Sequence, residues 1–422
     1  MSDAIVARPV NTVYTAAVRR RHFVFGSAAI AAKATYGYPA NDRIRVGCIG
    51  TGGRAQVLMR NFEIVKGLEI AAVCDIWNDN LEKAKQIASP GVYANKDYRA
   101  ILDRKDIDAV LIGAPDHHHA RMTIAACEAG KDVYVEKPLT HDLSEGEAVI
   151  ASQNRYNRIV QVGMQQRSMP QYQQAFEIIR SGQIGKVHKV HMTWNRNQSR
   201  WERTRYNIDP AAVDWKAFLG TAKPQPFDEY KFRQWRWFWD FGGGIFTDLM
   251  VHQVDIAHWI LDLEHPSDAS SIGDQFAAKG IWETPDTVQT IMRYPEKQLQ
   301  AYFEGTFVNA RNGEMIVFMG TEGSIYLDRG RYELHPEIKK QFGQEPSKPT
   351  LPYTEMVLGE GARGADFYKN PNGEALHLTN WMEAMRSRKK PIAPAEAGVS
   401  SASAAHLANL ALRSGQVARW KA

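Results

Sequence analysis

The chain has 422 residues, of which 44% are hydrophobic and 23% are charged, as is typical of a folded globular protein. This length exceeds what one hydrophobic core usually supports, so we expect two domains. The formal net charge is +5, but residues 1–33 hold five basic residues against Asp3 and carry most of it. The nearly neutral remainder argues against nucleic acid or an anionic membrane as partner, and no apolar run is long enough to predict a membrane span.

Residues 1–41 are predicted to form an export signal and an N-terminal arm. The sequence RRHFV at residues 20–24 resembles the twin-arginine export motif. A short apolar segment rich in alanine and glycine follows, and Ala32-Lys33-Ala34 is a candidate cleavage site, although the central Lys33 is unusual there. We therefore predict a periplasmic or otherwise extracytoplasmic protein. The alternative is a disordered basic tail on a cytoplasmic one.

Residues 44–75 have the pattern of a dinucleotide-binding unit. An apolar run, residues 44–49, leads into GTGGRA, and a second run, residues 70–74, ends at Asp75. The first glycine allows a tight turn, the second lets the backbone approach a pyrophosphate, and the alanine lets a helix sit on the sheet. The free N–H groups at the helix start favour phosphate. The predicted cofactor contacts are Gly50, Thr51, Gly52, Gly53, Arg54 and Asp75. The alternative is a glycine-rich turn in some other α/β protein.

Strands and helices continue to alternate as far as residue 165. Helices are predicted at residues 80–88, 98–103, 117–130 and 145–157, and strands at 109–114, 132–135 and 159–162. We expect Asp116 to be an N-cap and Ser144 to form a capping box with Glu147. This alternation predicts a parallel, doubly wound sheet, so residues 42–165 are expected to be a Rossmann domain.

Residues 166–422 show longer segments of alternating apolar and polar residues. These segments lie at residues 186–194, 287–293, 299–307, 315–320 and 323–327. Helices are predicted at 171–181, 246–261 and 373–388, the alanine-rich stretch 395–420 is expected to pack back on the body, and 329–372 is expected to be mostly loop. The pattern predicts an α+β domain with a large, mostly antiparallel open sheet.

Glu136-Lys137-Pro138 directly follows the predicted strand 132–135. Ligands of doubly wound sheets bind at the carboxyl ends of the strands. A partly desolvated Lys137 at that place is suited to polarise a substrate hydroxyl or carbonyl, and Pro138 fixes the direction in which the chain leaves. The alternative is an ordinary surface lysine at a strand end.

Three glycines at residues 242–244 precede a predicted helix that carries Asp248 and His252. Residues four apart share a helix face, and a carboxylate beside an imidazole favours the imidazolium and orients the ring for acid/base chemistry. Asp255 falls near the same face and is equally placed to orient the ring, so spacing does not choose between the two carboxylates. A solvated helix face is the alternative.

The segment YKFRQWRWFWDFGGG is rich in aromatic and basic side chains. Aromatic faces and arginine forks suit sugars, which present C–H patches and rows of hydroxyls. The predicted substrate-binding residues are Arg167, Trp235, Trp237 and Trp239; for each tryptophan, core packing is the alternative. We expect no metal at Asp116-His117-His118-His119, because consecutive helical residues point in different directions.

Taken together, these segments resemble the Gfo/Idh/MocA oxidoreductase family over about residues 44–328. The likeness is carried by the glycine turn, VCD ending at Asp75, GAPDHHHA at 113–120, EKP at 136–138 and GGGIFTDLMVH at 242–252. It implies a Rossmann domain plus an open-sheet domain that binds substrate and often oligomerises, here as a dimer or tetramer. It also implies that Lys137, Asp248 and His252 are the catalytic set. Pro115, His119, Glu136 and Lys137 would lie along the cofactor.

Members of this family mostly oxidise or reduce secondary alcohols of sugars, sugar nucleotides and inositols, and a few are NAD-dependent glycosidases. The segments VDWKAFLG and WRWFWDFGGG resemble an exported subgroup. We therefore expect hydride transfer at a secondary alcohol of a sugar, glycoside or polyol, with His252 taking the hydroxyl proton, Asp248 stabilising the imidazolium and Lys137 stabilising the alkoxide. The alternatives are a glycosidase cycle and an NAD-bound sensor without turnover.

The cofactor is predicted to be NAD rather than NADP, because the Asp75 carboxylate would repel a 2′-phosphate. An exported protein has no free pool of this cofactor outside the cytoplasm. The export prediction therefore implies that the cofactor is tightly bound and leaves the cell with the protein.

Overall fold

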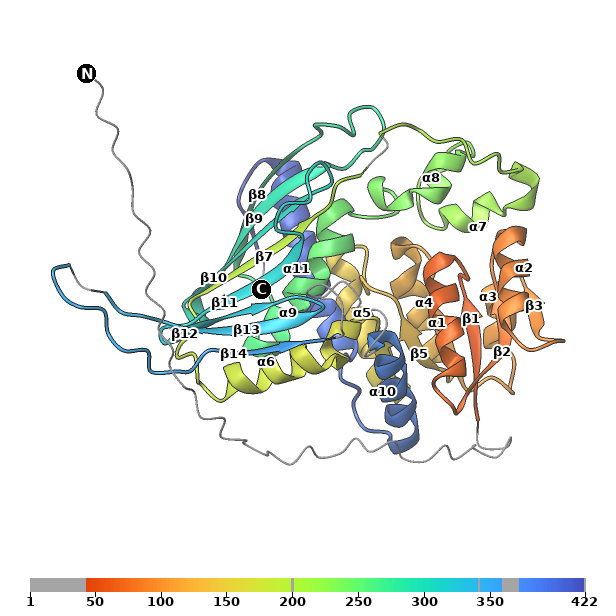
Figure 1. Ribbon diagram of the computed structural model, residues 1–422. Coiled ribbons are helices and arrows are strands. Elements are labelled where there is room, and N and C mark those ends of the chain that lie inside the picture. The colour runs from red at the N-terminus through yellow and green to blue at the C-terminus, as the bar shows by residue number, and fades with distance from the viewer. Residues whose placement is uncertain (1–42, 199–200, 341, 359–371, 421–422) are drawn as a thin grey trace, which may run out of the picture.

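The computed structural model describes residues 43–198, 201–340, 342–358 and 372–420, which form two domains side by side (Figure 1). The predicted export signal and arm lie outside the described residues. Within the described ranges, none of the helices combines the length and the apolar character needed to cross a membrane. The predicted boundary at residue 165 falls just after the last strand of the first domain.

The first domain contains a six-stranded parallel sheet in the order β3-β2-β1-β4-β5-β6. Its strands are β1 (Ile44–Ile49), β2 (Leu68–Cys74), β3 (Tyr93–Asn95), β4 (Ala109–Ile112), β5 (Asp132–Val135) and β6 (Val160–Val162). The helices that alternate with them are α1 (Gly53–Arg60), α2 (Asn78–Ile87), α3 (Tyr98–Leu102), α4 (Asp116–Glu128) and α5 (Gly146–Arg155). The predicted doubly wound sheet is confirmed. The strand order reverses between β1 and β4, where such sheets bind ligands.

Both faces of this sheet are covered, so its strands are almost continuously apolar and buried. Helices α4 and α5 cover one face. The other face is covered by α1 together with α10 (Gly373–Ser387), which returns from the far end of the chain. Leu378 and Trp381 of α10 are fully buried against this face. Burying a leucine side chain of this kind stabilises a fold by roughly 1.5–3 kcal/mol, so α10 belongs to the core of the first domain.

The second domain contains a nine-stranded sheet in the order β14-β13-β12-β11-β7-β10-β9-β8-β15. The strands are β7 (Lys189–Asn195), β8 (Asp268–Asp274), β9 (Thr287–Tyr294), β10 (Leu299–Thr306), β11 (Glu314–Met319), β12 (Gly323–Leu327), β13 (Arg331–Pro336), β14 (Thr354–Val357) and β15 (Ala418–Arg419). β7 and β10 pair in parallel, and the other neighbouring strands of this sheet pair antiparallel. The predicted large, mostly antiparallel sheet is therefore confirmed.

One face of this sheet carries α6 (Pro170–Arg180), α9 (Val251–Leu261) and α11 (Ala395–Ser414), so that these helices lie between the two domains (Figure 1). Strand β9 alternates buried and exposed residues because only one of its faces is covered. Helix α11 approaches closely because its buried face is mostly alanine, glycine and serine. The alanine-rich stretch thus packs back on the body as expected.

Two local details were not predicted. The described part of the segment 329–372 is mostly loop, as expected, but it also contains β13 and the edge strand β14. Strand β14 is only partly buried or exposed throughout, so it carries no alternating apolar pattern to detect. The capping box forms at Asp142 with Glu145 rather than at Ser144 with Glu147. Both pairs have the required spacing, and the chain enters the helix through a short 3₁₀ turn that uses the earlier pair.

Candidate functional site

Two adjoining cavities open at the carboxyl ends of the first sheet's strands. The first has a volume of about 760 Å³ and runs along the ends of β1 and β2. The second has a volume of about 310 Å³ and lies between the end of β5 and the start of α9. Five residues line both cavities, so the two are continuous: Arg54, Gly113, Ala114, Trp235 and Arg236.

The glycine turn forms one wall of the first cavity. Gly50 has a φ of +72°, and a Cβ there would lie 2.5 Å from the Ala114 backbone nitrogen, so only glycine fits. At Gly52 the nearest atom to such a Cβ would be 3.8 Å away, which leaves the backbone open to a ligand. Helix α1 then begins without a side-chain cap, so its first N–H groups are available. This open cradle fits a dinucleotide pyrophosphate.

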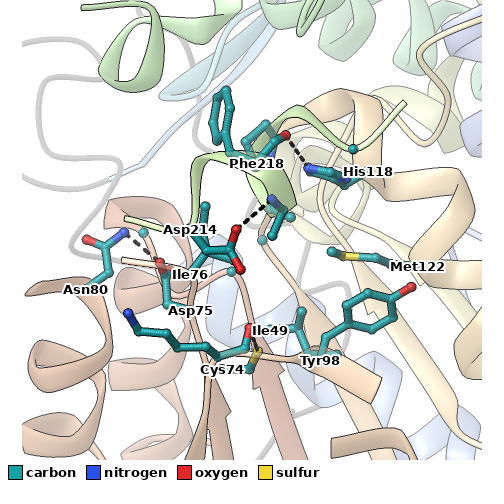
Figure 2. Close-up of a pocket in the computed structure, with 18 of the residues that line it drawn as sticks. Ile49, Cys74, Asp75, Ile76, Asn80, Tyr98, His118, Met122, Asp214 and Phe218 are labelled. Carbon is teal, nitrogen blue, oxygen red and sulfur yellow. Dashed lines mark hydrogen bonds between the residues drawn. The ribbon is translucent and has the colours of Figure 1, made fainter. Parts of the chain in front are cut away.

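Asp75 lies at the far wall of the first cavity, just after β2. Its carboxylate accepts hydrogen bonds from the Trp77 backbone N–H at 2.9 Å and from Asn80 Nδ2 at 3.2 Å, and Figure 2 shows the latter contact. Burial raises the pKa of Asp75 to about 6, although these donors oppose the shift. Asp75 is therefore mostly ionised at neutral pH. Thr51 does not line the cavity; its buried hydroxyl lies behind the wall, 3.4 Å from the Asp75 carboxylate.

Two short helices of the second domain close over this cavity. They are α7 (Trp215–Leu219) and α8 (Glu229–Arg233), which project from the large sheet toward the first domain (Figure 1). The Asp214 backbone N–H donates to the Ile76 carbonyl at 3.0 Å. His117 and His118 of α4 each place Nε2 within 2.8 Å of the Phe218 carbonyl, and Figure 2 shows His118 and Phe218 in contact. The cavity is therefore enclosed by both domains.

Lys137 and Asp248 meet in the second cavity. The Lys137 ammonium donates to the Asp248 backbone carbonyl at 2.6 Å and to its carboxylate at 3.0 Å. Arg236 donates to the same carboxylate oxygen at 3.0 Å. Although burial opposes ionisation of Asp248, the cations of Lys137 and Arg236 hold its pKa well below the usual value. Asp248 is thus a fixed anion shared by two cations.

His252 lines the same cavity, but its surroundings differ from the prediction. Its ring centroid lies 5.4 Å from that of Trp194, and its buried Nδ1 has no hydrogen-bond partner among the described residues. Burial and the cations of Lys137 and Arg329 lower the pKa of His252 well below its usual value. The expected Asp248–His252 pair is therefore wrong: the imidazole is neutral, and Asp248 serves Lys137 instead.

The physical reason is that other side chains bind both candidate carboxylates. Residues Phe246–Met250 form a π-helical turn before α9 begins. Residues four apart still lie near one face in such a turn, but the Asp248 carboxylate accepts hydrogen bonds from Lys137 and Arg236 instead. Asp255, the other candidate to orient the ring, is taken up by Arg167 through two bonds of 2.8 and 2.7 Å. Neither carboxylate orients His252.

Arg54 joins the glycine turn to two distant carboxylates. Its guanidinium donates to Glu136 at 2.7 Å and to Glu374 of α10 at 3.0 Å. Burial disfavours the Glu136 carboxylate, but the cations of Arg54 and Lys137 keep its pKa below the usual value. Pro115 lines the first cavity and His119 the second, with His119 Nε2 2.6 Å from the Ala114 carbonyl. The predicted cofactor residues other than Thr51 thus all line one of the two cavities.

The structure places only one of the four predicted substrate residues at the cavities. Trp235 lines both cavities. Trp237 is instead buried in the second domain, where it stacks on Trp282 at 4.3 Å between ring centroids. Trp239 lies beneath Arg413 and does not line either cavity. Arg167 is buried with Asp255 and also lies outside both cavities, so its assignment to the substrate site is corrected.

Other cavity residues were not identified from the sequence. Asp116 is the first residue of α4 rather than its N-cap, which is Pro115, and its buried carboxyl lines the second cavity. Arg196 reaches the cavity from directly after β7, Arg329 from the turn before β13, and Glu374 from α10. No local motif marks these residues, because only the assembled second domain brings them to this place. Among the described residues, no group of three or more His, Cys, Asp or Glu side chains is placed to hold a metal ion.

Comparisons with known proteins agree with this architecture. Residues 44–164 match the model of the oxidoreductase family with an NAD-binding Rossmann fold, GFO_IDH_MocA, and residues 172–326 match the GFO/IDH/MocA C-terminal domain. The chain is 26% identical over 297 residues to a myo-inositol 2-dehydrogenase of Thermotoga maritima, an alignment that covers 68% of this chain and 76% of that protein.

Two further proteins are similar to this chain, one over a short stretch of sequence and the other in fold. A glycosyl hydrolase family 109 protein of Solibacter usitatus is 36% identical over 118 residues, which cover 26% of this chain and 27% of that protein. A levoglucosan dehydrogenase in complex with NADH and levoglucosan has the same fold, with a TM-score of 0.69 at 18% identity over 89% of this chain and 99% of that one. Because the two family models cover both domains, the chain belongs to the Gfo/Idh/MocA oxidoreductase family.

Proposed function

We propose that this protein is an NAD-dependent oxidoreductase that acts on a secondary alcohol of a sugar or related polyol. The observation that carries the proposal is the placement of Lys137 and His252 in a small cavity continuous with the larger, glycine-walled one. The T. maritima relative is named as a myo-inositol 2-dehydrogenase, which is a polyol enzyme. Its likeness supports the same class of substrate here.

The first cavity fits the cofactor. The glycine turn would receive the pyrophosphate, and Asp75 would accept hydrogen bonds from the ribose hydroxyls while disfavouring a 2′-phosphate. When bound, NAD supplies the hydride acceptor for alcohol oxidation. Pro115 would line the path between the ribose and the second cavity.

The second cavity supplies the proton chemistry. His252 is neutral because its pKa is lowered by burial and by Lys137, so it can accept the hydroxyl proton without first losing one. Lys137 is held by both the carbonyl and the carboxylate of Asp248, so its remaining N–H can donate to the developing alkoxide. The Asp248 carboxylate fixes the position of Lys137 rather than that of His252.

Closure of α7 and α8 over the first cavity supports a cofactor that stays with the protein. We further propose export through the RRHFV segment and assembly into a dimer or tetramer through the open sheet. Ile272 and Ile291 are large apolar side chains exposed on that sheet, which supports the second idea. Fusing residues 1–41 to a reporter tests export, and light scattering of the purified protein tests assembly.

The experiment that tests the function uses the purified full chain. The NAD-loaded protein is incubated with inositols, hexoses and glycosides, and the products are separated by mass spectrometry. A keto-sugar together with reduced cofactor is the expected outcome. A hydrolysed glycoside would favour the glycosidase cycle, for which the short family 109 likeness is the specific support. If wild type and His252→Ala fail alike across the panel, the protein is an NAD-bound sensor.

A further inference from the structure

The charges around the second cavity are unevenly distributed. Five cations line it: Arg54, Lys137, Arg196, Arg236 and Arg329. At one end Arg54 forms ion pairs with two carboxylates, Glu136 and Glu374. At the other end Lys137 and Arg236 share the single carboxylate of Asp248. The cavity is therefore anionic at the Arg54 end and cationic at the end away from it.

The cationic end has another uncompensated group. Arg329 is paired with Glu314 at 2.9 Å, but Arg196 has no ion pair with any described carboxylate. Asp116 does not supply the missing charge, because burial raises the pKa of its carboxyl well above the usual value despite Lys137 and Arg236. Among the described residues, this end therefore holds four cations, for which Asp248 and Glu314 are the ion-pair partners.

Arg196 is held in place at the cavity. Its backbone N–H donates to the Thr306 carbonyl at 2.7 Å, which continues the pairing of β7 with β10. Its guanidinium lies 5.2 Å from the ring centroid of Trp194, and the guanidinium of Arg329 lies 4.7 Å from the same centroid. Two like charges gathered at one ring repel each other, and an anion that meets Arg196 would relieve that repulsion.

We propose that the substrate of this site is a sugar acid, and that its carboxylate binds the guanidinium of Arg196 at the rim of the second cavity. The inference rests on the proposed function, because it takes this cavity as the substrate site. The carboxylate end would face Arg196 and lie away from Glu136 and Glu374, which would repel it. The reacting hydroxyl would then lie toward Lys137 and His252.

A carboxylate suits this site better than other anions do. The guanidinium of arginine presents parallel N–H groups that match the two oxygens of a carboxylate, and a bound carboxylate adds a single negative charge. The cavity of about 310 Å³ is small and continuous with the cofactor cavity. A monosaccharide acid places its ring and its charge within one such space.

The test is a binding measurement on the NAD-loaded full chain, which reads out without turnover. Calorimetry measures the affinity for two pairs of sugars. D-glucuronate is compared with D-glucose, and D-galacturonate is compared with D-galactose. We expect each acid to bind about tenfold or more tightly than its neutral counterpart, with the advantage shrinking as salt is added. In Arg196→Gln the advantage should fall to about twofold or less, while the affinity for the neutral sugars stays within about twofold.

Arg205→Gln is the matched control, since Arg205 is exposed and lies outside both cavities. It should bind all four sugars as wild type does. The proposal is overturned if the acids bind no more tightly than the neutral sugars, or if Arg196→Gln keeps the preference. It is also overturned if D-glucose 6-phosphate binds tightly while both acids bind weakly, since the site would then select phosphate.

An assay of cofactor reduction distinguishes failure of this inference from failure of the proposed function. If the acids bind through Arg196 but no cofactor is reduced, the binding inference stands and the oxidoreductase proposal fails. If neutral polyols are oxidised and the acids are not favoured in binding, the oxidoreductase proposal stands and the sugar-acid inference fails.

Discussion

Lys137 and Asp248 are joined at two points, because one ammonium donates both to the backbone carbonyl of Asp248 and to its side-chain carboxylate. The two residues are far apart in the sequence and come from different domains. This contact makes the position of Lys137 depend on how the π-helical turn at Phe246–Met250 is built. The reacting end of the site is therefore set by backbone geometry as well as by side chains.

Replacing Lys137 by methionine should lower kcat/KM for a substrate alcohol by about 10²-fold or more, because the developing alkoxide loses its charged donor. Asp248→Asn should lower it less, since the carbonyl still holds the ammonium. Steady-state kinetics measure both effects, with NAD binding and melting temperature as controls for folding. A Lys137→Met enzyme with unchanged kcat/KM would remove Lys137 from the chemistry.

The pH profile of kcat/KM tests the state of His252. Because the pKa of His252 lies well below its usual value, it should stay neutral and the profile should be flat from about pH 6 to pH 8. His252→Ala should lose about 10²-fold or more in kcat/KM, as expected for loss of a general base. A fall in rate centred near pH 6.5 in wild type would contradict the buried, neutral imidazole.

Asp75→Ser should reduce the preference for NAD over NADP by about tenfold or more, because the carboxylate that repels a 2′-phosphate is gone. The register of β2 and β3 brings Lys96 next to Asp75, and Lys96 also lines the cavity, so a cation is at hand for the phosphate. Cofactor titrations measure the ratio, and Asp79→Ser on the exposed side of α2 is the control. Since the pKa of Asp75 is about 6, the preference in wild type should also narrow below pH 6.

The buried histidines should make the fold sensitive to acid. Burial lowers their pKa values to about 4 in His117, His377 and His406, about 3 in His258 and about 2 in His118. Below about pH 6.5 the unfolded chain protonates these rings and the folded chain does not, so the free energy of unfolding falls as pH falls. Each buried ring lowers the free energy of unfolding by up to about 1.4 kcal/mol for each pH unit below this point. Asp75 has a raised pKa and acts in the opposite direction, so it offsets the contribution of about one ring.

Denaturant titrations at pH 7 and pH 5 measure this loss, which should amount to several kcal/mol. His377→Asn should shrink the pH dependence, because one buried histidine with a lowered pKa is removed. A free energy of unfolding that is the same at both pH values would contradict the assignment.

Arg167 and Asp255 should matter for stability rather than for substrate binding. Removing one partner leaves the other as an uncompensated buried charge, so Asp255→Ala should destabilise the fold by about 3–5 kcal/mol. Replacing both with apolar residues should restore much of this loss. Chemical denaturation measures the stability, and an unchanged KM in the double variant would support the structural role.

The strands of the first sheet and the glycine turn could be predicted because their signals are local. The apolar run 44–49, the turn and Asp75 lie within about thirty residues, and each has a distinct physical requirement. The pairing of Asp248 could not be predicted from spacing, because Lys137 and Arg236, which bind its carboxylate, come from other parts of the chain. Arg167 and Trp237 were assigned to the substrate site on residue type, which does not reveal a buried partner such as Asp255 or Trp282.

The remaining site residues depend on tertiary structure alone. Glu374 reaches Arg54 across a separation of 320 residues. Arg196 and Arg329 arrive on different parts of the large sheet, and both lie against Trp194. No short sequence pattern predicts these contacts, because they depend on how the second domain packs against the first.

Helix α10 completes the core of the first domain, although it follows most of the second domain in the sequence. The strands of the first domain end at Val162, yet Leu378 and Trp381, which finish its core, are made only after strands β7 to β14. Glu374, at the start of the same helix, is also the second partner of the arginine in the glycine turn. A nascent chain that has not yet reached α10 therefore lacks this cover on one face of the first sheet and the Glu374 partner of Arg54. The lining of the second cavity is complete only after α10 has been synthesised.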